Sequence, residues 1–294
     1  MTLVVATGES FDLAEGPLWD PIRGVLLWVD IRTGTVLSGT LNANGTITTL
    51  DRVAFPGTTG AVAVSEAGDW IVAGAEEILV HQPSGEIVTG PRIVPPASGR
   101  RLNEGKVDPL GRFLVGTCRP DDGPTVIETL SVVHSDGRVE VLDDDLTLSN
   151  GLGWSPDAST MYSIDTVARI VNSRPFDPVT GALGPREVFL TLDEGYPDGM
   201  CVDVEGHVWI AIWSLGQVRR YSPAAELVQV IDVPAPNTSC VAFAGPDLAT
   251  LVITTATKDL APEALAQYPL SGHLFTLDPG VRGLPANLWS GLPA

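Results

Sequence analysis

Glu15, Glu104, Asn150 and Asp198 have oxygen-bearing side chains, and each stands immediately before a glycine at well-separated points of the chain. Carboxylate and amide oxygens are hard donors that suit Ca²⁺, Mg²⁺ or Mn²⁺, and carboxylates also bind Zn²⁺. Two or three carboxylates in one place would repel one another and raise each other's pKa unless a positive charge lay between them. These residues therefore indicate a divalent-cation site, provided that the fold brings them together.

The same residues occupy one place in a sequence repeat. Each repeat has a polar residue, a small residue, a short apolar strand, a turn and a second apolar strand, as in residues 150–154 followed by residues 161–165. The small residues stand at positions 16, 60, 105, 151, 199 and 239, so the steps between them are 44, 45, 46, 48 and 40 residues. A period of about 45 residues is typical of a propeller blade, a sheet of four short antiparallel strands.

The repeat predicts an all-β fold, a six-bladed β-propeller formed by residues 1–294 as a single domain. The 31 Gly and 24 Pro residues recur between short β-rich runs, as turns between such strands require. We expect a strand at residues 3–6 to pair with the C-terminal blade, because this closes the ring and removes exposed sheet edges. A β-sandwich could use the same short strands, but it does not predict a regular period.

Residues at one phase of the repeat are equivalent around the propeller axis, so the polar residue of each repeat should lie at the mouth of the innermost strand. The six are Glu15, Thr59, Glu104, Asn150, Asp198 and Thr238. Taken singly, Glu15, Asn150 and Asp198 are better explained as turn residues at strand starts than as ligands. Their common phase in three of the six repeats favours the metal site.

Composition and charge exclude several classes of function. The chain has 36 Asp and Glu against 17 Lys and Arg, a net charge of −19 that repels phosphate backbones and anionic membranes, so no nucleic acid or membrane partner is expected. Apolar runs are too short for a transmembrane helix, which needs roughly 20 residues, and the N-terminal residues lack the features of a secretory signal. A cytoplasmic protein is expected. Cys118, Cys201 and Cys240 are odd in number and far apart, which predicts reduced thiols and no disulfide.

Nearly end to end, the chain resembles the SMP-30/gluconolactonase/regucalcin-like (LRE) family of six-bladed, metal-dependent lactonases. The phrases that carry the resemblance are Leu13-Ala14-Glu15-Gly16-Pro17-Leu18-Trp19, Arg101-Leu102-Asn103-Glu104-Gly105-Lys106-Val107-Asp108, Ser149-Asn150-Gly151, Tyr196-Pro197-Asp198-Gly199 and Gly272-His273-Leu274-Phe275. Five such phrases in the family's order make the resemblance specific.

The resemblance implies a set of site residues. Glu15, Asn150 and Asp198 would bind one divalent cation, with Ca²⁺, Zn²⁺, Mn²⁺ and Mg²⁺ as candidates, and Arg101 and Asn103 would hold the substrate. Two further substrate contacts are expected on the same blade: Glu104, where the family usually has Asp, and Asp121, in the loop after residues 118–120.

This set predicts an enzyme, a hydrolase that opens a sugar lactone to the aldonic acid. The cation would polarise the carbonyl and activate a water molecule. Asp198 is the expected catalytic residue, as the proton acceptor, although Glu15 could serve equally well. Arg101 would contact sugar hydroxyls or the developing negative charge, unless it is a surface arginine like the neighbouring Arg100.

The expected partner is thus a small-molecule sugar lactone, and no obligate protein partner is implied. Two alternatives stay open at this point. A phosphotriesterase-like hydrolase would use the same metal site on another substrate class, and a calcium-binding regulatory propeller would carry out no chemistry at all.

Overall fold

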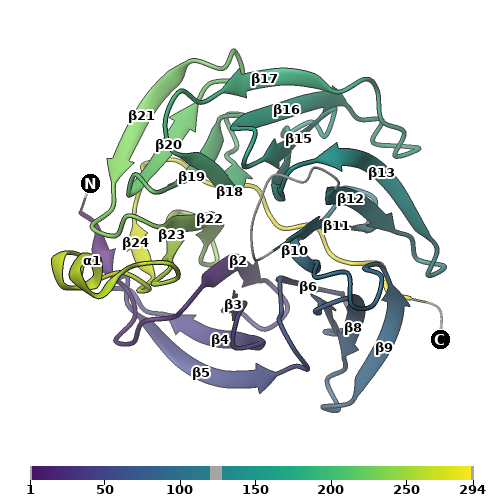
Figure 1. The fold of residues 1–294 in the computed structure, drawn as a ribbon, viewed down its shortest axis with the longest axis horizontal. Helices are drawn as coiled ribbons and strands as arrows, with labels where there is room; N and C mark the ends of the chain where they lie inside the picture. Colours follow the sequence, from purple (N-terminus) through teal and green to yellow (C-terminus); the bar gives the residue numbers. More distant parts are fainter. Residues whose placement is uncertain (1, 120–127, 293–294) are drawn as a thin grey trace.

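The computed structural model describes residues 2–119 and 128–292, whose strands form six four-stranded antiparallel sheets around a central axis (Figure 1). The six-bladed β-propeller predicted from the repeat is therefore confirmed. In chain order, the first five blades are β2 (Ala14–Asp20), β3 (Val25–Asp30), β4 (Thr35–Leu41) and β5 (Ile47–Ala54); β6 (Ala61–Val64), β7 (Trp70–Ala73), β8 (Glu77–His81) and β9 (Ile87–Arg92); β10 (Arg101–Val107), β11 (Phe113–Cys118), β12 (Glu128–Val133) and β13 (Val139–Leu146); β14 (Ser149–Trp154), β15 (Thr160–Asp165), β16 (Ile170–Pro175) and β17 (Glu187–Thr191); β18 (Tyr196–Val202), β19 (Val208–Trp213), β20 (Gln217–Tyr221) and β21 (Leu227–Asp232).

The sixth blade joins the two ends of the chain. It contains β22 (Thr238–Ala244), β23 (Thr250–Thr255), β24 (Phe275–Leu277) and β1 (Val4–Val5). Strand β1 pairs antiparallel with β24, with Val4 opposite Thr276 and Val5 opposite Phe275. The predicted closure by an N-terminal strand is thus confirmed, and it leaves no open gap in the ring.

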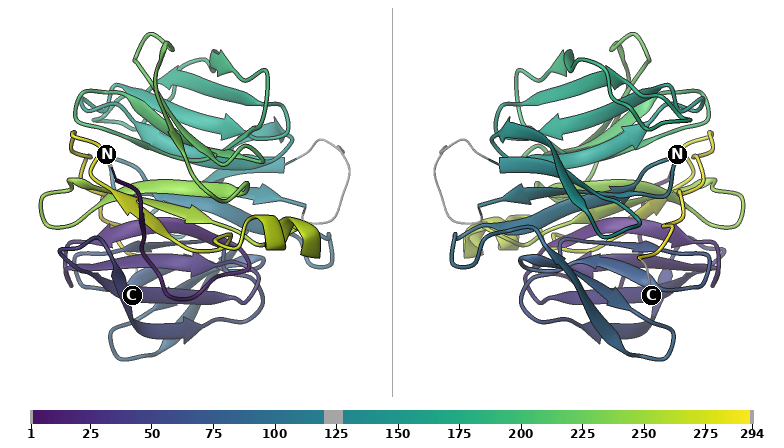
Figure 2. Two further views of the ribbon diagram at one scale, coloured as in Figure 1. Left: turned by 90° about the vertical axis from the view of Figure 1, so that its left-hand side faces the viewer. Right: turned by 90° about the vertical axis from the view of Figure 1, so that its right-hand side faces the viewer.

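Because every blade begins with its innermost strand, the first residues of β2, β6, β10, β14, β18 and β22 all lie on one face of the ring. The short helix α1 (Pro262–Gln267) lies on this face, and the C-terminal segment 278–292 runs along the opposite face (Figure 2). That segment crosses from blade five to blade two, with backbone contacts from Val204 to Arg282 and from Val64 to Trp289. It therefore lies over one end of the central channel.

In blades two, four and five, the small residue of the repeat is required by the close approach of the next blade. A Cβ atom on Gly60 would lie 2.1 Å from the Asn103 carbonyl oxygen, and one on Gly151 would lie 2.6 Å from the Asp198 carbonyl oxygen. The core lies between adjacent blades and is built from their apolar strand faces, with Trp28 and Trp209 fully buried.

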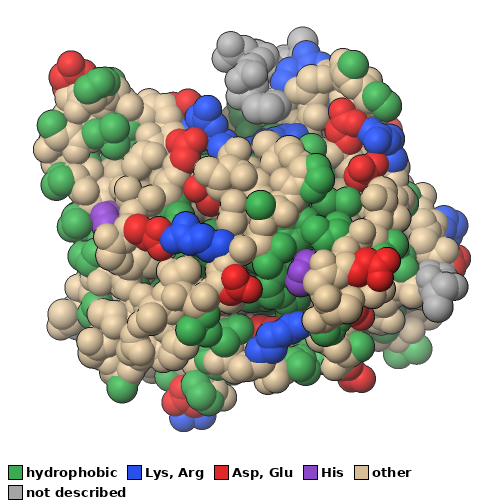
Figure 3. Space-filling model, turned by 90° about the horizontal axis from the view of Figure 1, so that it is seen from below, with side chains coloured by type: hydrophobic (Ala, Val, Ile, Leu, Met, Phe, Trp, Pro, Cys, Tyr) green, Lys and Arg blue, Asp and Glu red, His purple; other side chains and the backbone are tan. Residues whose placement is uncertain are grey.

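The outer strands carry the charged surface. Exposed ion pairs such as Arg138–Glu140, at 2.8 Å, link neighbouring positions there. Acidic and basic side chains lie interspersed on the face seen in Figure 3, so the negative excess is not gathered into one patch on that face. None of the described helices is long and apolar enough to cross a membrane.

Candidate metal centre

A β-bulge marks the point where the polar residues of the repeat enter the channel. The register of the innermost strand with its neighbour shifts immediately after Glu15, Asn150 and Pro197, and the same irregularity follows Leu102 and Thr238. A bulge re-aims the side chains at its site. The repeated dipeptide of a polar and a small residue is thus the sequence signature of a bulge that points side chains toward the axis.

Glu15, Asn150 and Asp198 are all buried, on β2, β14 and β18. The Asn150 amide nitrogen donates hydrogen bonds to Asp198 Oδ1 and to Thr166 Oγ1. The Gly16 amide donates to Glu15 Oε2 at 2.9 Å. Because Asn150 makes both hydrogen bonds through its side-chain nitrogen, its side-chain oxygen is available to bind a metal ion.

The Glu15 and Asp198 carboxylates form no ion pair with a basic side chain in the described part of the chain. Burial, followed by the charges of Asp198 and Glu104, raises the pKa of Glu15 well above its usual range. Burial and Glu104 likewise raise the pKa of Asp198, against the opposing effects of the Asn150 hydrogen bond and of Lys258 and Arg101. A divalent cation among these oxygens would remove the repulsion, and two carboxylates with an amide oxygen are hard donors, so the residues fit a metal site.

Arg101 and Asn103 lie beside this group on β10. Arg101 donates to Asn103 Oδ1 at 2.8 Å, and the Asn103 amide nitrogen donates to the Ser149 carbonyl oxygen at 3.0 Å. Arg100, by contrast, is paired with Glu128 at 3.0 Å. The two arginines therefore differ: Arg100 is held in an ion pair, whereas Arg101 is oriented by a residue of the candidate site.

Glu104 lies deeper than the sequence analysis implied. Its carboxylate is buried and lies close to Glu15 and to Cys240, a residue that the sequence analysis did not assign to the site. In the sixth blade, Thr238 has the phase expected of a ring member, but its hydroxyl donates to the Ala235 carbonyl oxygen and Cys240 faces the carboxylates instead. Asp121, the remaining expected contact, lies outside the described residues.

Lys106 is a second residue that sequence reasoning missed. Its ammonium group donates to the carbonyl oxygens of Leu152 and Met200, both at 2.9 Å, and so links β10 to β14 and β18. Its charge lowers the pKa of Glu104, against the larger effect of burial, which raises it. Lys106 thus supplies positive charge inside the channel.

The sequence model of the family described as "SMP-30/Gluconolactonase/LRE-like region" matches residues 13–257. The chain belongs to this family. Regucalcin from Xenopus laevis is 31% identical over 292 residues, which cover 96% of each chain. The family resemblance seen in the sequence is therefore confirmed.

Solved structures of the family share the fold over almost the whole chain. The calcium-binding protein regucalcin from Agrobacterium tumefaciens is 29% identical, with a TM-score of 0.89 over 98% of this chain and 96% of that chain. A luciferin-regenerating enzyme is 26% identical, with a TM-score of 0.87 over 95% of this chain and 96% of that chain.

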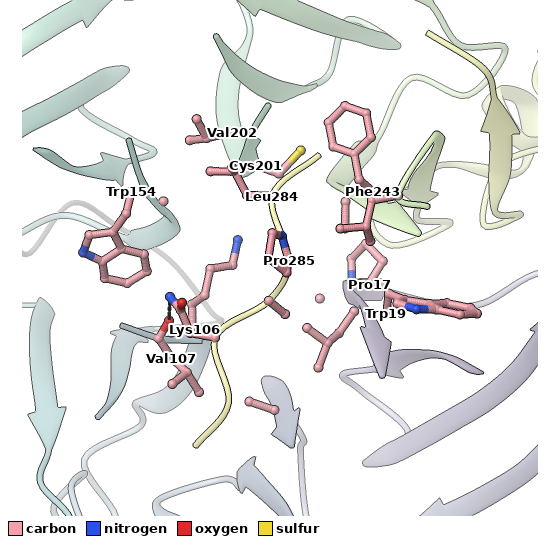
Figure 4. Close-up of a pocket in the computed structure, with 18 of the residues that line it drawn as sticks. Pro17, Trp19, Lys106, Val107, Trp154, Cys201, Val202, Phe243, Leu284 and Pro285 are labelled. Atoms are coloured by element: carbon pink, nitrogen blue, oxygen red, sulfur yellow. Dashed lines mark hydrogen bonds between the residues drawn. The ribbon is translucent and has the colours of Figure 1, made fainter. Parts of the chain in front are cut away.

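A cavity of about 250 Å³ continues the channel inward from the candidate centre of this family member (Figure 4). Its wall is mainly apolar and includes Trp19, Trp154 and Phe243, while Leu284 and Pro285 of the C-terminal segment lie across it. Glu104, Lys106 and Cys240 are among the polar residues that also line it. Glu15, Asn150 and Asp198 are not part of this wall, so Glu104 and Cys240 lie on the inner side of the centre.

Proposed function

We propose that this protein is a divalent-metal-dependent lactonase that hydrolyses a sugar lactone to the aldonic acid. The observation that carries the proposal is the buried group of Glu15, Asn150 and Asp198, which offers two carboxylates and an amide oxygen at the channel mouth. Membership in a family whose description includes gluconolactonase supports this activity, and so does the likeness to a luciferin-regenerating enzyme.

Glu15, Asn150 and Asp198 would hold one divalent cation, for which Ca²⁺, Zn²⁺, Mn²⁺ and Mg²⁺ are the candidates. When bound, it would polarise the lactone carbonyl and lower the pKa of a water molecule. We assign proton acceptance to Asp198, because a carboxylate that would bind the cation lies beside the water molecule that the cation would activate. Glu15 would bind the same cation and is the alternative acceptor.

Arg101 and Asn103 would orient the substrate. Because Arg101 is fixed by its hydrogen bond to Asn103, its remaining N–H groups are preorganised to donate to sugar hydroxyls or to the charge that develops on the carbonyl oxygen. Glu104 is a weaker candidate for substrate contact, since it faces the inner cavity. Asp121 remains an expected contact from the sequence alone.

A second candidate function is metal binding without catalysis. It is favoured by the likeness to the Agrobacterium protein, which is named a calcium-binding protein. A phosphotriester is the competing substrate class for the same centre, since a bound cation can polarise a phosphoryl oxygen as well as a carbonyl.

The test is hydrolysis of five- and six-membered aldonolactones by metal-stripped protein, before and after each of the four ions is added. We expect an ion to restore hydrolysis in the wild type but not in Asp198→Asn. The matched control is Asp232→Asn, an exposed aspartate of the same blade, which should behave like the wild type. Lactone hydrolysis absent from folded, metal-bound protein would contradict the proposal in favour of the calcium-binding function, and faster phosphotriester turnover would change the substrate class.

A further inference from the structure

A thiol lies among the carboxylates on the inner side of the proposed centre. Cys240 Sγ and one carboxylate oxygen each of Glu15 and Glu104 all lie within 4.8 Å of one another. The three residues come from β22, β2 and β10 and are 2%, 5% and 5% exposed. Zinc–ligand bonds of about 2.0–2.3 Å allow two ligands of one ion to be at most about 4.6 Å apart. The group is thus close to the size of a single coordination sphere.

Glu104 has no hydrogen-bond donor or ion-pair partner for its carboxylate in the described part of the chain. The nearby Lys106 ammonium is held by the carbonyl oxygens of Leu152 and Met200. Glu104 is only 5% exposed, and a buried carboxylate without a donor is costly unless a cation or another polar group satisfies it. Since Glu104 lines the cavity together with Cys240, a cation at this point would satisfy it.

The charges of the group balance when a divalent cation is present. Glu15, Glu104 and a Cys240 thiolate carry three negative charges, and Lys106 with a divalent cation carries three positive charges. Binding would replace the S–H bond of Cys240 with a sulfur–metal bond and release one proton to solvent, as coordinated thiols are deprotonated.

We propose that Glu15, Glu104 and Cys240 form a second cation site, inward of Asn150 and Asp198, that prefers thiophilic ions such as Zn²⁺, Co²⁺ and Cd²⁺ to Ca²⁺ and Mg²⁺. The preference follows from the thiolate, a soft ligand that hard ions avoid. Glu15 joins the two sites and so couples occupancy of one to that of the other. The proposed inner site does not depend on whether the protein hydrolyses lactones, so its test is independent of the test of the proposed function.

The test is titration of metal-stripped, full-length protein with Co²⁺ alone, followed by absorption spectroscopy. We expect the near-ultraviolet charge-transfer band of a cobalt–thiolate bond in the wild type and its loss in Cys240→Ser. Cys201→Ser is the matched control and should keep the band, since Cys201 lines the same cavity but lies outside the group. Glu104→Gln should weaken Co²⁺ binding by more than about tenfold, the least that loss of an outer-shell partner usually costs a metal site.

Calcium affinity distinguishes a ligand from a packing residue. Cys240→Ser should leave Ca²⁺ binding, measured by calorimetry, unchanged, and an equal loss of Ca²⁺ and Co²⁺ binding would overturn the proposal. A band that survives in Cys240→Ser would overturn it as well. X-ray absorption of the wild-type cobalt complex requires no variant and should show one sulfur neighbour; a spectrum with only oxygen and nitrogen neighbours would contradict the site even if Cys240→Ser does not fold.

Discussion

The innermost strands of three blades have an acidic residue near each end, and the two ends differ in how the acid is partnered. At one end lie Glu15, Glu104 and Asp198, with few donors and with each pKa raised by burial. At the other end lie three fully buried aspartates, each paired with an arginine: Asp20 with Arg23 at 2.9 Å, Asp108 with Arg112 at 2.6 Å and Asp203 with Arg220 at 2.6 Å.

Both groups consist of buried acidic residues. They differ in whether an arginine neutralises them, and this difference distinguishes the structural acids from those of the candidate site. Asp203, Glu205 and His207 lie close enough together to resemble metal ligands. Arg220, however, pairs with both acids, and Asp203 also accepts hydrogen bonds from the Trp209 indole and two backbone amides. The arginine end is already neutralised, whereas the other end would be neutralised by a bound cation.

The largest effect should come from removing a charge at the unpartnered end. Asp198→Asn keeps the shape of the side chain but replaces a charged metal ligand with a neutral amide and removes the assigned base. We expect kcat to fall by about 10²–10⁴-fold, the usual contribution of a general base, while the protein stays folded. Steady-state lactone hydrolysis together with urea unfolding would measure both quantities. Full activity in Asp198→Asn would remove the distinction between the two ends.

The matching change at the partnered end should affect stability instead. Asp203→Asn leaves Arg220 without its buried partner, so the free energy of unfolding should fall by about 3 kcal/mol, the lower end for a broken buried pair, because Arg220 keeps exposed Glu205. Urea unfolding would measure the change. Glu205→Gln, the control, should lose no more than about 1 kcal/mol. A loss of metal binding with unchanged stability in Asp203→Asn would reverse the assignment of the two ends.

Metal should stabilise the protein through the unpartnered end only. An ion at 100 times its dissociation constant adds about 2.7 kcal/mol to the free energy of unfolding, because it binds only the folded state. We expect this gain in the wild type and in Glu205→Gln, and its absence in Asp198→Asn, as measured by thermal unfolding with and without Ca²⁺. An equal gain in all three proteins would place the ion elsewhere.

The metal-free protein should lose stability as the pH rises. The folded-state pKa values of Glu15 and Asp198 are raised above their unfolded values. At a pH between the unfolded-state and the folded-state pKa, the folded protein therefore binds more protons than the unfolded protein. Their stabilising effect is complete below the unfolded pKa and disappears as the pH rises through the folded pKa, by at most about 1.4 kcal/mol per pH unit for each group. Urea unfolding across this window would measure the slope. Glu15→Gln should flatten it, and a slope of opposite sign would contradict the account.

The fold could be predicted from the sequence because its information is local and repeated. Five of the six blades repeat the same bulge, as at Asn150-Gly151, so the period of the ring is visible in the residue pattern. Helix α1 and segment 278–292 carry no such pattern, and the sequence analysis did not anticipate them. The cavity that this segment covers was missed for the same reason.

The site could be predicted only as far as the repeat is regular. The phase of the repeat selected Glu15, Asn150 and Asp198, which the structure places together, and it selected Thr238 in place of Cys240, because the bulge of β22 shifts the register there. Lys106 was missed for another reason: its long side chain reaches across to two other blades, and sequence spacing carries no information on such contacts.

The most direct measurement is anomalous diffraction from crystals of the metal-stripped protein soaked in Mn²⁺. The account predicts a peak of anomalous density within coordination distance of Glu15, Asn150 and Asp198, at the end of the channel where the acids lack arginine partners. A peak beside Asp203 and Glu205, or none at the channel mouth in protein that binds Mn²⁺ in solution, would contradict the central claim.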